Sequence, residues 1–329
     1  MHETQYTITV DTEEEWDWSS GYPTESRSVS NIQALPQFQE ACDKYDAKVT
    51  YFVNHTVLAD HNAAGVIKKL ASHPNVEIGF HIHPWNTPPL ADSNEVSVRE
   101  SYLHNLPQAV AITKLNTVLE IFAEHGLSPT SFRGGRYSTC DWIQDHLYAH
   151  GCIADASILP FTTWPDDGAP DFRSRDLTPR RREIAPGKPG LWEIPLTLAF
   201  TKQPWAFWQK FYEWGARPPL RHLRCVGIAE RLLLQRVWLN LEHPMGESMP
   251  KLLSVLRPMQ LPCINFTMHS SSLVAGLNSY TKSEVDLGRL YQRLETVLSL
   301  LSTWSEFTPA TVTAVAEKLE MQYHANSRN

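Results

Sequence analysis

The chain has 329 residues, of which 42% are hydrophobic and 20% are charged, so it can bury a large core and is not expected to be disordered. Its formal net charge of -7 at pH 7 gives no general attraction to nucleic acid or to anionic lipid. We therefore expect a small or neutral partner and no binding to nucleic acid.

Short apolar or β-branched runs alternate with longer stretches of helical spacing, a pattern typical of a parallel α/β protein. The predicted strands, in chain order, are residues 6–10, 49–53, 77–83, 131–134, 153–157, 192–197 and 263–269. The predicted helices are residues 32–45, 64–72, 93–125, 142–150, 283–301 and 310–322. Seven strands are close to the number of a closed barrel, and the helices would pack on its outside.

Two segments depart from this alternation. Residues 159–190 are rich in Pro, Gly, Asp and Arg and predict a long surface excursion at the rim of a site. Residues 201–258 contain an aromatic cluster followed by helical spacing over 228–241. We interpret 201–258 as a helical insertion buried against the barrel, because aromatic side chains chiefly supply buried area. Contact with a glycan, a membrane surface or a partner subunit is the alternative, and residues 1–329 are expected to form one domain.

The chain start and the cysteines bear on the compartment. Residues 1–5 lack the basic start and apolar run of a secretory signal, and no apolar run approaches the roughly 20 residues that span a bilayer. The five cysteines include no closely spaced pair and predict neither a disulfide framework nor a zinc knuckle. We expect a cytoplasmic, reduced protein without a transmembrane segment.

Two pairs of potential metal ligands lie at the ends of predicted strands. Asp11 and Glu13 are two residues apart, as are His81 and His83, so each pair shares one face of its strand. Taken alone, Asp11 and Glu13 could belong to an acidic loop, and His81 and His83 could be two hydrogen-bonded histidines without a metal. Together, two imidazoles and a carboxylate are the ligands of an open catalytic metal site, which favours a metal-dependent hydrolase.

Two further motifs offer a positioning group and an acid. Arg133 stands at a strand end before two glycines and can reach a carboxylate such as Asp11, although a surface arginine in a turn is the alternative. His269 ends the last predicted strand, where its ordinary pKa near 6.5 suits a general acid. The serines at 270–272 offer a rival nucleophile, but the chain has no GxSxG elbow to support it.

With these four motifs in this order, residues 6–273 resemble the polysaccharide deacetylase family, the NodB-homology domain of carbohydrate esterase family four, in a divergent branch. The resemblance implies a deformed (β/α)7 TIM-like barrel. It also implies metal-assisted hydrolysis of an N- or O-acetyl group on a carbohydrate or glycan precursor. The mixed nitrogen and oxygen donors suit Zn²⁺ best among the divalent ions, with nickel, cobalt, manganese or iron as alternatives. Glu13, His81 and His83 would hold that metal.

The resemblance also implies catalytic roles. Asp11 would be the base, Arg133 would position it, the backbone N–H of Tyr137 would help to hold the oxyanion, and His269 would be the acid. Asp155 falls where the family often has an acidic residue in its fourth motif. The tryptophans and the asparagine that follow the first two motifs could line a sugar subsite or pack at its rim: Trp16, Trp18, Trp85 and Asn86.

Two departures from the family pattern leave alternatives open. The family's acidic residues are adjacent, whereas Thr12 separates Asp11 from Glu13, so Glu13 is preferred over Glu14 only by strand alternation. The family's histidines are usually four residues apart, whereas here they are two apart. The alternatives are a metal-dependent amidohydrolase for a small non-sugar amide or ureide, and a glycan-binding or complex-forming module whose metal site has decayed.

Overall fold

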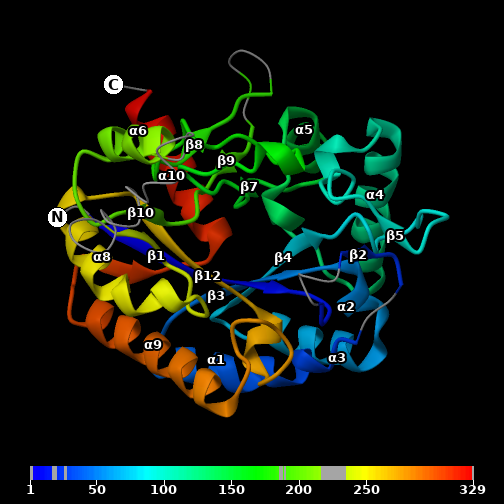
Figure 1. Ribbon diagram of the computed structural model, residues 1–329, viewed down its shortest axis with the longest axis horizontal. Helices are drawn as coiled ribbons and strands as arrows, with labels where there is room; N and C mark the ends of the chain where they lie inside the picture. The colour runs from blue at the N-terminus through cyan, green and yellow to red at the C-terminus, as the bar shows by residue number, and fades with distance from the viewer. Residues whose placement is uncertain are drawn as a thin grey trace.

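The computed structural model describes residues 3–16, 21–25, 28–184, 188, 190–215 and 235–327. A curled sheet lies at its centre in the order β12-β1-β3-β4-β6-β7-β9-β8, with β13 also paired to β1 (Figure 1). The pair of β8 and β9 is antiparallel and all other pairs in this sheet are parallel. The strands are β1 (Thr4–Thr12), β3 (Val49–Val53), β4 (Val76–Ile82), β6 (Ser131–Gly134), β7 (Ala154–Asp155), β8 (Arg180–Arg181), β9 (Trp192–Glu193), β12 (Cys263–His269) and β13 (Phe307–Pro309).

Backbone hydrogen bonds join the two sides of the curled sheet. The N–H of Thr197, just after β9, donates to the carbonyl of Asn265 in β12 (3.2 Å), and its own carbonyl accepts from Leu239 (2.8 Å). The N–H of Thr267 in turn donates to the carbonyl of Leu239 (2.9 Å). The expected α/β barrel is therefore confirmed, with an irregular segment at its seam. Two small sheets flank it: β2 (Tyr22–Pro23) with β5 (Glu95–Val96), and β10 (Leu198–Phe200) with β11 (Arg236–Trp238).

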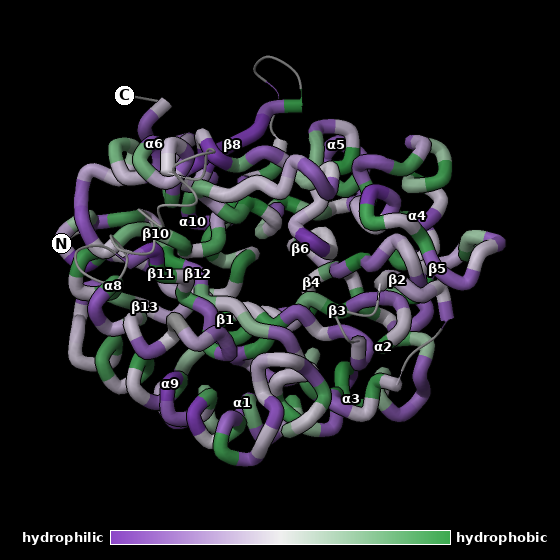
Figure 2. The backbone as a smooth tube through the Cα atoms, in the orientation of Figure 1, coloured by the Kyte–Doolittle hydropathy of each residue, from purple (hydrophilic) through white to green (hydrophobic). Residues whose placement is uncertain are grey.

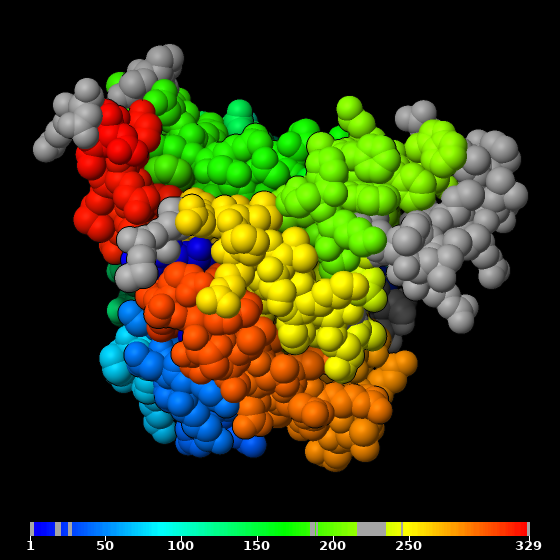
Figure 3. Space-filling view, turned by 90° about the vertical axis from the view of Figure 1, so that its left-hand side faces the viewer, coloured from blue at the N-terminus to red at the C-terminus, as the bar shows by residue number. Residues whose placement is uncertain are grey.

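Helices cover the outside of the sheet, and hydrophobic and hydrophilic residues alternate along outer helices such as α1 and α9 (Figure 2). Figure 3 shows α8 and α9 beside each other on one face, in yellow and orange, with α6 above them in light green. None of the described helices is both long and apolar enough to cross a membrane. The helices are α1 (Leu35–Asp43), α2 (His55–Ala59), α3 (His61–Ala71), α4 (Gln108–Glu124), α5 (Asp141–Ala149), α6 (Trp205–Gly215), α8 (Met249–Leu256), α9 (Glu284–Ser302) and α10 (Val312–Asn326).

Alternation along the strands divides the interior into two apolar layers. Ile8 and Val10 of β1 belong to the layer between the sheet and the helices, whereas the residues between them face the barrel axis. The second layer is small and joins Phe52 of β3 to Val312 and Val315 of α10. Because α10 contributes its apolar face to this layer, it seals the amino-terminal end of the barrel.

Several predicted elements match the structure closely, and others do not. Strands 49–53, 131–134 and 263–269 have the predicted bounds. The predicted helix 93–125 is wrong before residue 108, because residues 95–96 pair with β2 and a loop follows. Of the helix predicted over 228–241, residues 228–234 lie outside the described residues, and the prediction is wrong for the rest. Arg236–Trp238 is strand β11, because its partner β10 satisfies its backbone.

Candidate metal and catalytic site

The predicted site residues gather at the carboxyl ends of four strands. In the parallel register of β1 and β12, Asp11 lies opposite His269, and in that of β4 and β6, His81 lies opposite Arg133. Parallel strands in a barrel bring their carboxyl ends to one face, which is where barrel enzymes place their active sites. Residues distant in the sequence are therefore neighbours here.

Glu13, His81 and His83 form a buried cluster whose ligand atoms converge. The Oε2 atom of Glu13 lies 3.5 Å from Nε2 of His81 and 3.0 Å from Nε2 of His83. The two Nε2 atoms are 3.2 Å apart. Among the residues that the structure describes, this is the one group of three or more potential ligand residues close enough to share a metal ion. Two imidazoles and one carboxylate leave coordination positions open, as in catalytic zinc sites.

Hydrogen bonds on the far side of each imidazole decide which electron pairs face the cluster. Nδ1 of His81 lies 2.7 Å from the carbonyl oxygen of Arg133, and Nδ1 of His83 lies 2.7 Å from Oε1 of Glu14. A carbonyl or carboxylate oxygen accepts a hydrogen bond, so each Nδ1 donates, and each Nε2 can turn a lone pair toward a metal when its imidazole is neutral. Three electron-pair donors thus point at one place, which a cation satisfies. The residues present fit a divalent metal.

In the absence of a metal cation, a proton on His83 supplies part of the positive charge at this cluster. Burial by itself lowers the pKa of His83, but the carboxylates of Glu14 and Glu13 outweigh it and raise the pKa to about 10. Burial also raises the pKa of Glu13, yet His83 and His269 outweigh that effect and hold it well below its ordinary value. The cluster therefore keeps a negative carboxylate beside a positive imidazole, and a metal would compete with that proton.

The acidic run after β1 gives each carboxylate a different partner. Glu13 faces the two Nε2 atoms, whereas Glu14 bonds to Nδ1 of His83 and accepts from Nδ2 of Asn54 (2.5 Å). Glu15 accepts from the backbone N–H of Asn31 (2.9 Å) at the start of a 3₁₀ turn. This arrangement supports Glu13 as the ligand and makes Glu14 a support for His83.

Arg133 is fully buried and holds Asp11 in place. Its Nη1 donates to Oδ1 of Asp11 (2.7 Å) and to the hydroxyl of Thr267 (3.2 Å), and its Nη2 donates to the hydroxyl of Thr9 (2.9 Å). Bonds on two nitrogens fix the plane of the guanidinium. Because Oδ1 of Asp11 is bonded to Arg133, the other oxygen, Oδ2, lies on the cavity side, 4.0 Å from Nε2 of His269.

His269 is paired with Glu242, a residue that the sequence reasoning missed. Nδ1 of His269 lies 2.6 Å from Oε1 of Glu242, and the His269 backbone N–H donates to Oε2 of the same carboxylate (3.0 Å). The hydroxyl of Ser272 also donates to Glu242. Burial by itself lowers the pKa of His269, but the carboxylates of Glu242 and Glu13 raise it to about 10. His269 therefore keeps a proton to donate at neutral pH.

Glu242 follows a period-two pattern that identifies an extended segment. Val237, Leu239 and Leu241 are buried at every second position, and the carboxylate comes directly after them. Because residues 228–241 were predicted to form a helix, Glu242 was not recognised as a residue at the end of an extended segment. Asp155, which the family resemblance had suggested as an acidic motif residue, does not line the cavity. Its carboxylate accepts hydrogen bonds from Thr139 (2.6 Å) and Gln144 (2.7 Å).

Tyr137 and Arg136 form a turn at the edge of the site. Their φ angles are 61° and 53°, a left-handed conformation that costs energy for residues with side chains. Such strain is common at functional sites, where the surrounding structure must support it. Burial, followed by the negative charge of Asp11, raises the pKa of the Tyr137 hydroxyl well above its ordinary value, so the hydroxyl stays neutral.

The predicted residues surround a cavity of about 300 Å³. Its lining includes Asp11, Glu13, His81, His83, Arg136, Tyr137, His269 and the aromatic residues Trp16, Tyr22, Trp164, Trp238 and Tyr280. Residue 18 lies outside the described residues. Trp85 stacks on His83 (4.1 Å between ring centroids) and packs behind the site. The serines at 270–272 bond to Glu13, Glu242 and Asn278, which gives them positioning contacts.

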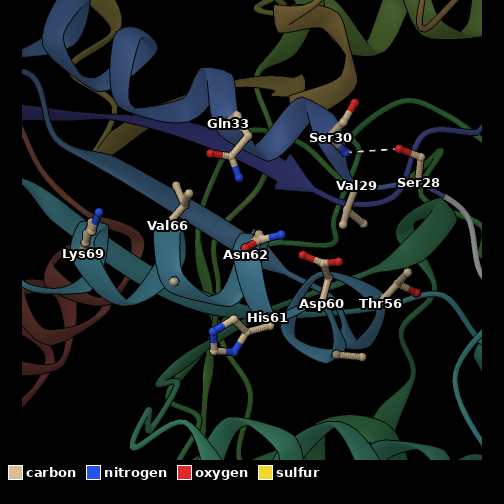
Figure 4. Close-up of a pocket in the computed structure, with 12 residues that line it drawn as sticks. Ser28, Val29, Ser30, Gln33, Thr56, Asp60, His61, Asn62, Val66 and Lys69 are labelled. Atoms are coloured by element: carbon tan, nitrogen blue, oxygen red, sulfur yellow. Dashed lines mark hydrogen bonds between the residues drawn. The ribbon is translucent and has the colours of Figure 1, made fainter.

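A larger cavity, of about 780 Å³, shares no lining residue with this site. It lies beside α2 and α3 (Figure 4). Its polar groups serve local structure: Asp60 caps α3 by accepting from the N–H of Ala63 (2.8 Å), and the Ser28 hydroxyl accepts from the N–H of Ser30 (3.3 Å). The site at the strand ends is therefore the better functional candidate.

Fold and site together define a class, the α/β-barrel proteins with a cluster of potential metal ligands at the carboxyl ends of their strands. Solved structures give this class a family likeness. A Mycobacterium smegmatis protein assigned as a polysaccharide deacetylase has a TM-score of 0.58 and 14% identity, over 98% of this chain and 92% of that one. A Pseudomonas aeruginosa PAO1 protein assigned in the same way has a TM-score of 0.55 and 11% identity, over 95% and 90%.

A Parabacteroides distasonis protein assigned as a glycoside hydrolase or deacetylase also matches, with a TM-score of 0.51 and 11% identity over 97% of this chain and 70% of that one. No protein-family model matches the chain, and no curated protein matches it in sequence. The resemblance inferred from the four motifs is thus confirmed at the level of the fold. The chain has the fold of polysaccharide deacetylases, at the low identity of a divergent branch.

Proposed function

We propose that the protein is a metal-dependent hydrolase that removes an acetyl group from an N-acetylated, or O-acetylated, sugar or glycan precursor. The observation that carries this proposal is the convergence of three kinds of group on one cavity. The Glu13, His81 and His83 cluster lines the same cavity as Asp11, a carboxylate fixed by an arginine, and His269, an imidazole that retains its proton. Amide hydrolysis needs these three functions: an electrophile, a base and an acid.

Glu13, His81 and His83 would hold the metal, for which Zn²⁺ suits the mixed nitrogen and oxygen donors best. When bound, it would polarise the acetyl carbonyl and make water more acidic. Glu14 would orient the His83 ring and raise its basicity through the bond at Nδ1.

Asp11 would accept the proton of the attacking water at Oδ2. Arg133 occupies Oδ1 and so fixes the direction in which Oδ2 points. His269 would donate a proton from Nε2 to the leaving nitrogen, because Glu242 holds its Nδ1–H and keeps the ring protonated. With 4.0 Å between Oδ2 of Asp11 and Nε2 of His269, the proposed base and acid are close enough to act on one substrate group in the cavity. The backbone N–H of Tyr137 would hydrogen-bond to the developing oxyanion.

The test joins metal content with acetate release. Protein stripped by a chelator would be reloaded with Zn²⁺, Co²⁺, Ni²⁺ or Mn²⁺, and bound metal per chain would be measured together with acetate released from N-acetylated hexosamine glycosides. We expect about one metal per chain and acetate release that depends on it. The matched control is His324→Ala, which removes an exposed imidazole of α10.

The other outcomes separate the alternatives. Acetate release by metal-free protein would contradict the proposed chemistry. Metal binding without activity on any acetylated sugar, but with activity on small amides or cyclic ureides, would favour an amidohydrolase. A chain that binds no metal and still binds glycans would be a module that has lost catalysis.

A further inference from the structure

The cavity is bounded by two aromatic walls that a single ion pair joins. From this arrangement we propose that the site takes one sugar unit at the end of a chain, or a free monosaccharide, and excludes units inside a polymer. This rests on the proposed function and specifies its substrate.

The first wall consists of Trp16 and Tyr22, which line the cavity beside Glu13, His81 and His83, with Trp85 packed behind them. Trp16, Tyr22 and Trp85 contact one another pairwise, with centroids 4.9 to 5.4 Å apart. Trp85 stacks on His83, and the indole N–H of Trp16 donates to the carbonyl of Gly21 (2.8 Å). Each ring is therefore held by its neighbours. The wall is rigid and ends at the imidazole of a ligand.

The second wall comes from segments later in the chain, between residues 137 and 280. Tyr137 and Trp164 lie nearly parallel, with an interplanar angle of 18° and centroids 6.4 Å apart, and Trp238 meets Tyr137 edge-on at 6.1 Å. Tyr280 continues the lining beside them. A pyranose ring has apolar C–H faces and a polar edge of hydroxyls, so flat aromatic walls on two sides suit one ring between them.

Arg136 connects the two walls. Its guanidinium lies 4.9 Å over the ring of Tyr22 in the first wall, and its Nη2 donates to Asp167 (2.8 Å), which shares a short turn with Trp164 of the second wall. A further bond from Nη1 to the hydroxyl of Ser101 (2.7 Å) fixes the guanidinium. The side chains of Arg136 and Asp167 are only 19% and 37% exposed. A polymer running between Tyr22 and Trp164 would have to break this bridge.

The size of the cavity agrees with a single unit. A volume of about 300 Å³ is at the lower end for small-molecule sites, whereas a polymer needs a groove that continues past the reacting residue. One acetylated ring can reach the metal ligands, with its neighbour in the chain pointing out through the mouth. The bridge makes the site end-specific.

Binding measurements test this without relying on turnover. Asp11→Asn protein would be titrated by calorimetry with the methyl glycoside of N-acetylglucosamine and with its β-1,4-linked oligomers of two to six units. The galactosamine and mannosamine glycosides would be tested as well. We expect the Kd to stay within about threefold from one unit to six, since each oligomer presents one end to one site. A Kd at least tenfold lower for the hexamer would overturn the proposal, because it would reveal further subsites.

Product analysis of the active protein gives a second, independent readout. With the hexamer, we expect one acetate per oligomer, lost from a terminal unit as located by mass spectrometry. Loss from internal units would overturn the proposal while leaving the deacetylase function intact. If no acetylated sugar of the panel is bound or hydrolysed, the proposed function fails and this inference fails with it.

Asp167→Ala tests the bridge itself. Opening the rim should lower the Kd of the hexamer relative to that of the single unit by about tenfold and allow internal acetyl groups to be lost. The matched control is Asp171→Ala, which removes an exposed ion pair with Arg173 in the same loop, and neither residue lines the cavity. The control should behave as the wild type. An Asp167→Ala protein with unchanged length dependence would overturn the role of the bridge.

Discussion

Replacing Glu242 by Gln should change how the rate depends on pH more than it changes the rate at low pH. Glu242 is the largest of the charges that raise the pKa of His269 to about 10, against an ordinary value near 6.5. Its Oε1 lies 2.6 Å from Nδ1 of His269, and Gln keeps an oxygen acceptor there without the charge. An opposite charge at this distance is worth about 1 to 3 pKa units, so His269 should titrate near pH 7 to 9 in the variant.

The assay is the pH–rate profile of acetate release for both proteins. At pH 6 His269 is protonated in either protein, so the rates should agree within a few fold. For a shift of about two units, the protonated fraction at pH 9 is about tenfold lower in the variant, and the rate should fall in proportion. Charges common to both proteins move both curves equally, so the prediction concerns the difference between them.

The pH dependence of the unfolding free energy provides a second test of the same His269–Glu242 ion pair. Because the folded pKa of His269 is raised, the ion pair stabilises the wild type fully below pH 6.5, and this contribution is lost as the pH rises through about 10. The difference in unfolding free energy between wild type and variant should therefore shrink toward high pH. The control Glu193→Gln removes a largely buried carboxylate outside the site. Superimposable pH profiles for wild type and Glu242→Gln would refute the reasoning.

Three further substitutions test the remaining roles. The double variant His81→Ala/His83→Ala should retain no stoichiometric metal and no activity, and full activity would reject the ligand assignment. Asp11→Asn should keep its metal, measured by elemental analysis, and lose about 10²- to 10⁴-fold in kcat, because only the proton acceptor is removed; unimpaired turnover would exclude Asp11 as the base. Glu14→Gln should weaken metal affinity by about 10- to 100-fold in a chelator competition, and an unchanged affinity would show that the bond to His83 Nδ1 does not tune the ligand.

Much of the barrel could be predicted because its strands are short, apolar and bounded by polar residues. The strand over 49–53 is buried at every position, and a continuous apolar run of this length predicts a strand covered on both faces. The two-residue spacing of Asp11 with Glu13 and of His81 with His83 predicted, by alternation alone, that each pair shares one face of its strand. Both pairs stand at the ends of predicted parallel strands, and the carboxyl ends of parallel strands meet at one face of a barrel, so the pairs could be predicted to lie together.

Other features depend on contacts that no local pattern encodes. Strand β13 is only three residues long and ends in Pro309, and it forms because β1 offers it an edge. The regular strand β9 covers only two of the six residues predicted there, since the chain leaves β7 to bond with β12. Glu242 lies far from His269 in sequence, and its role is visible only when both segments are side by side. The turn at Arg136 and Tyr137 has left-handed angles that their residue types do not predict.

The position of β1 affects how the protein can fold. This first strand carries Asp11 and is followed directly by Glu13, yet two of its three neighbours, β12 and β13, come from residues 263–309. During synthesis, β1 must therefore wait with an unpaired edge until residues 263–309 have left the ribosome. Such non-local pairing makes folding slow and leaves the nascent chain prone to aggregation. The candidate site can be completed only after residues 263–309 have been translated, so removal of strand β13 should impair folding of the site itself.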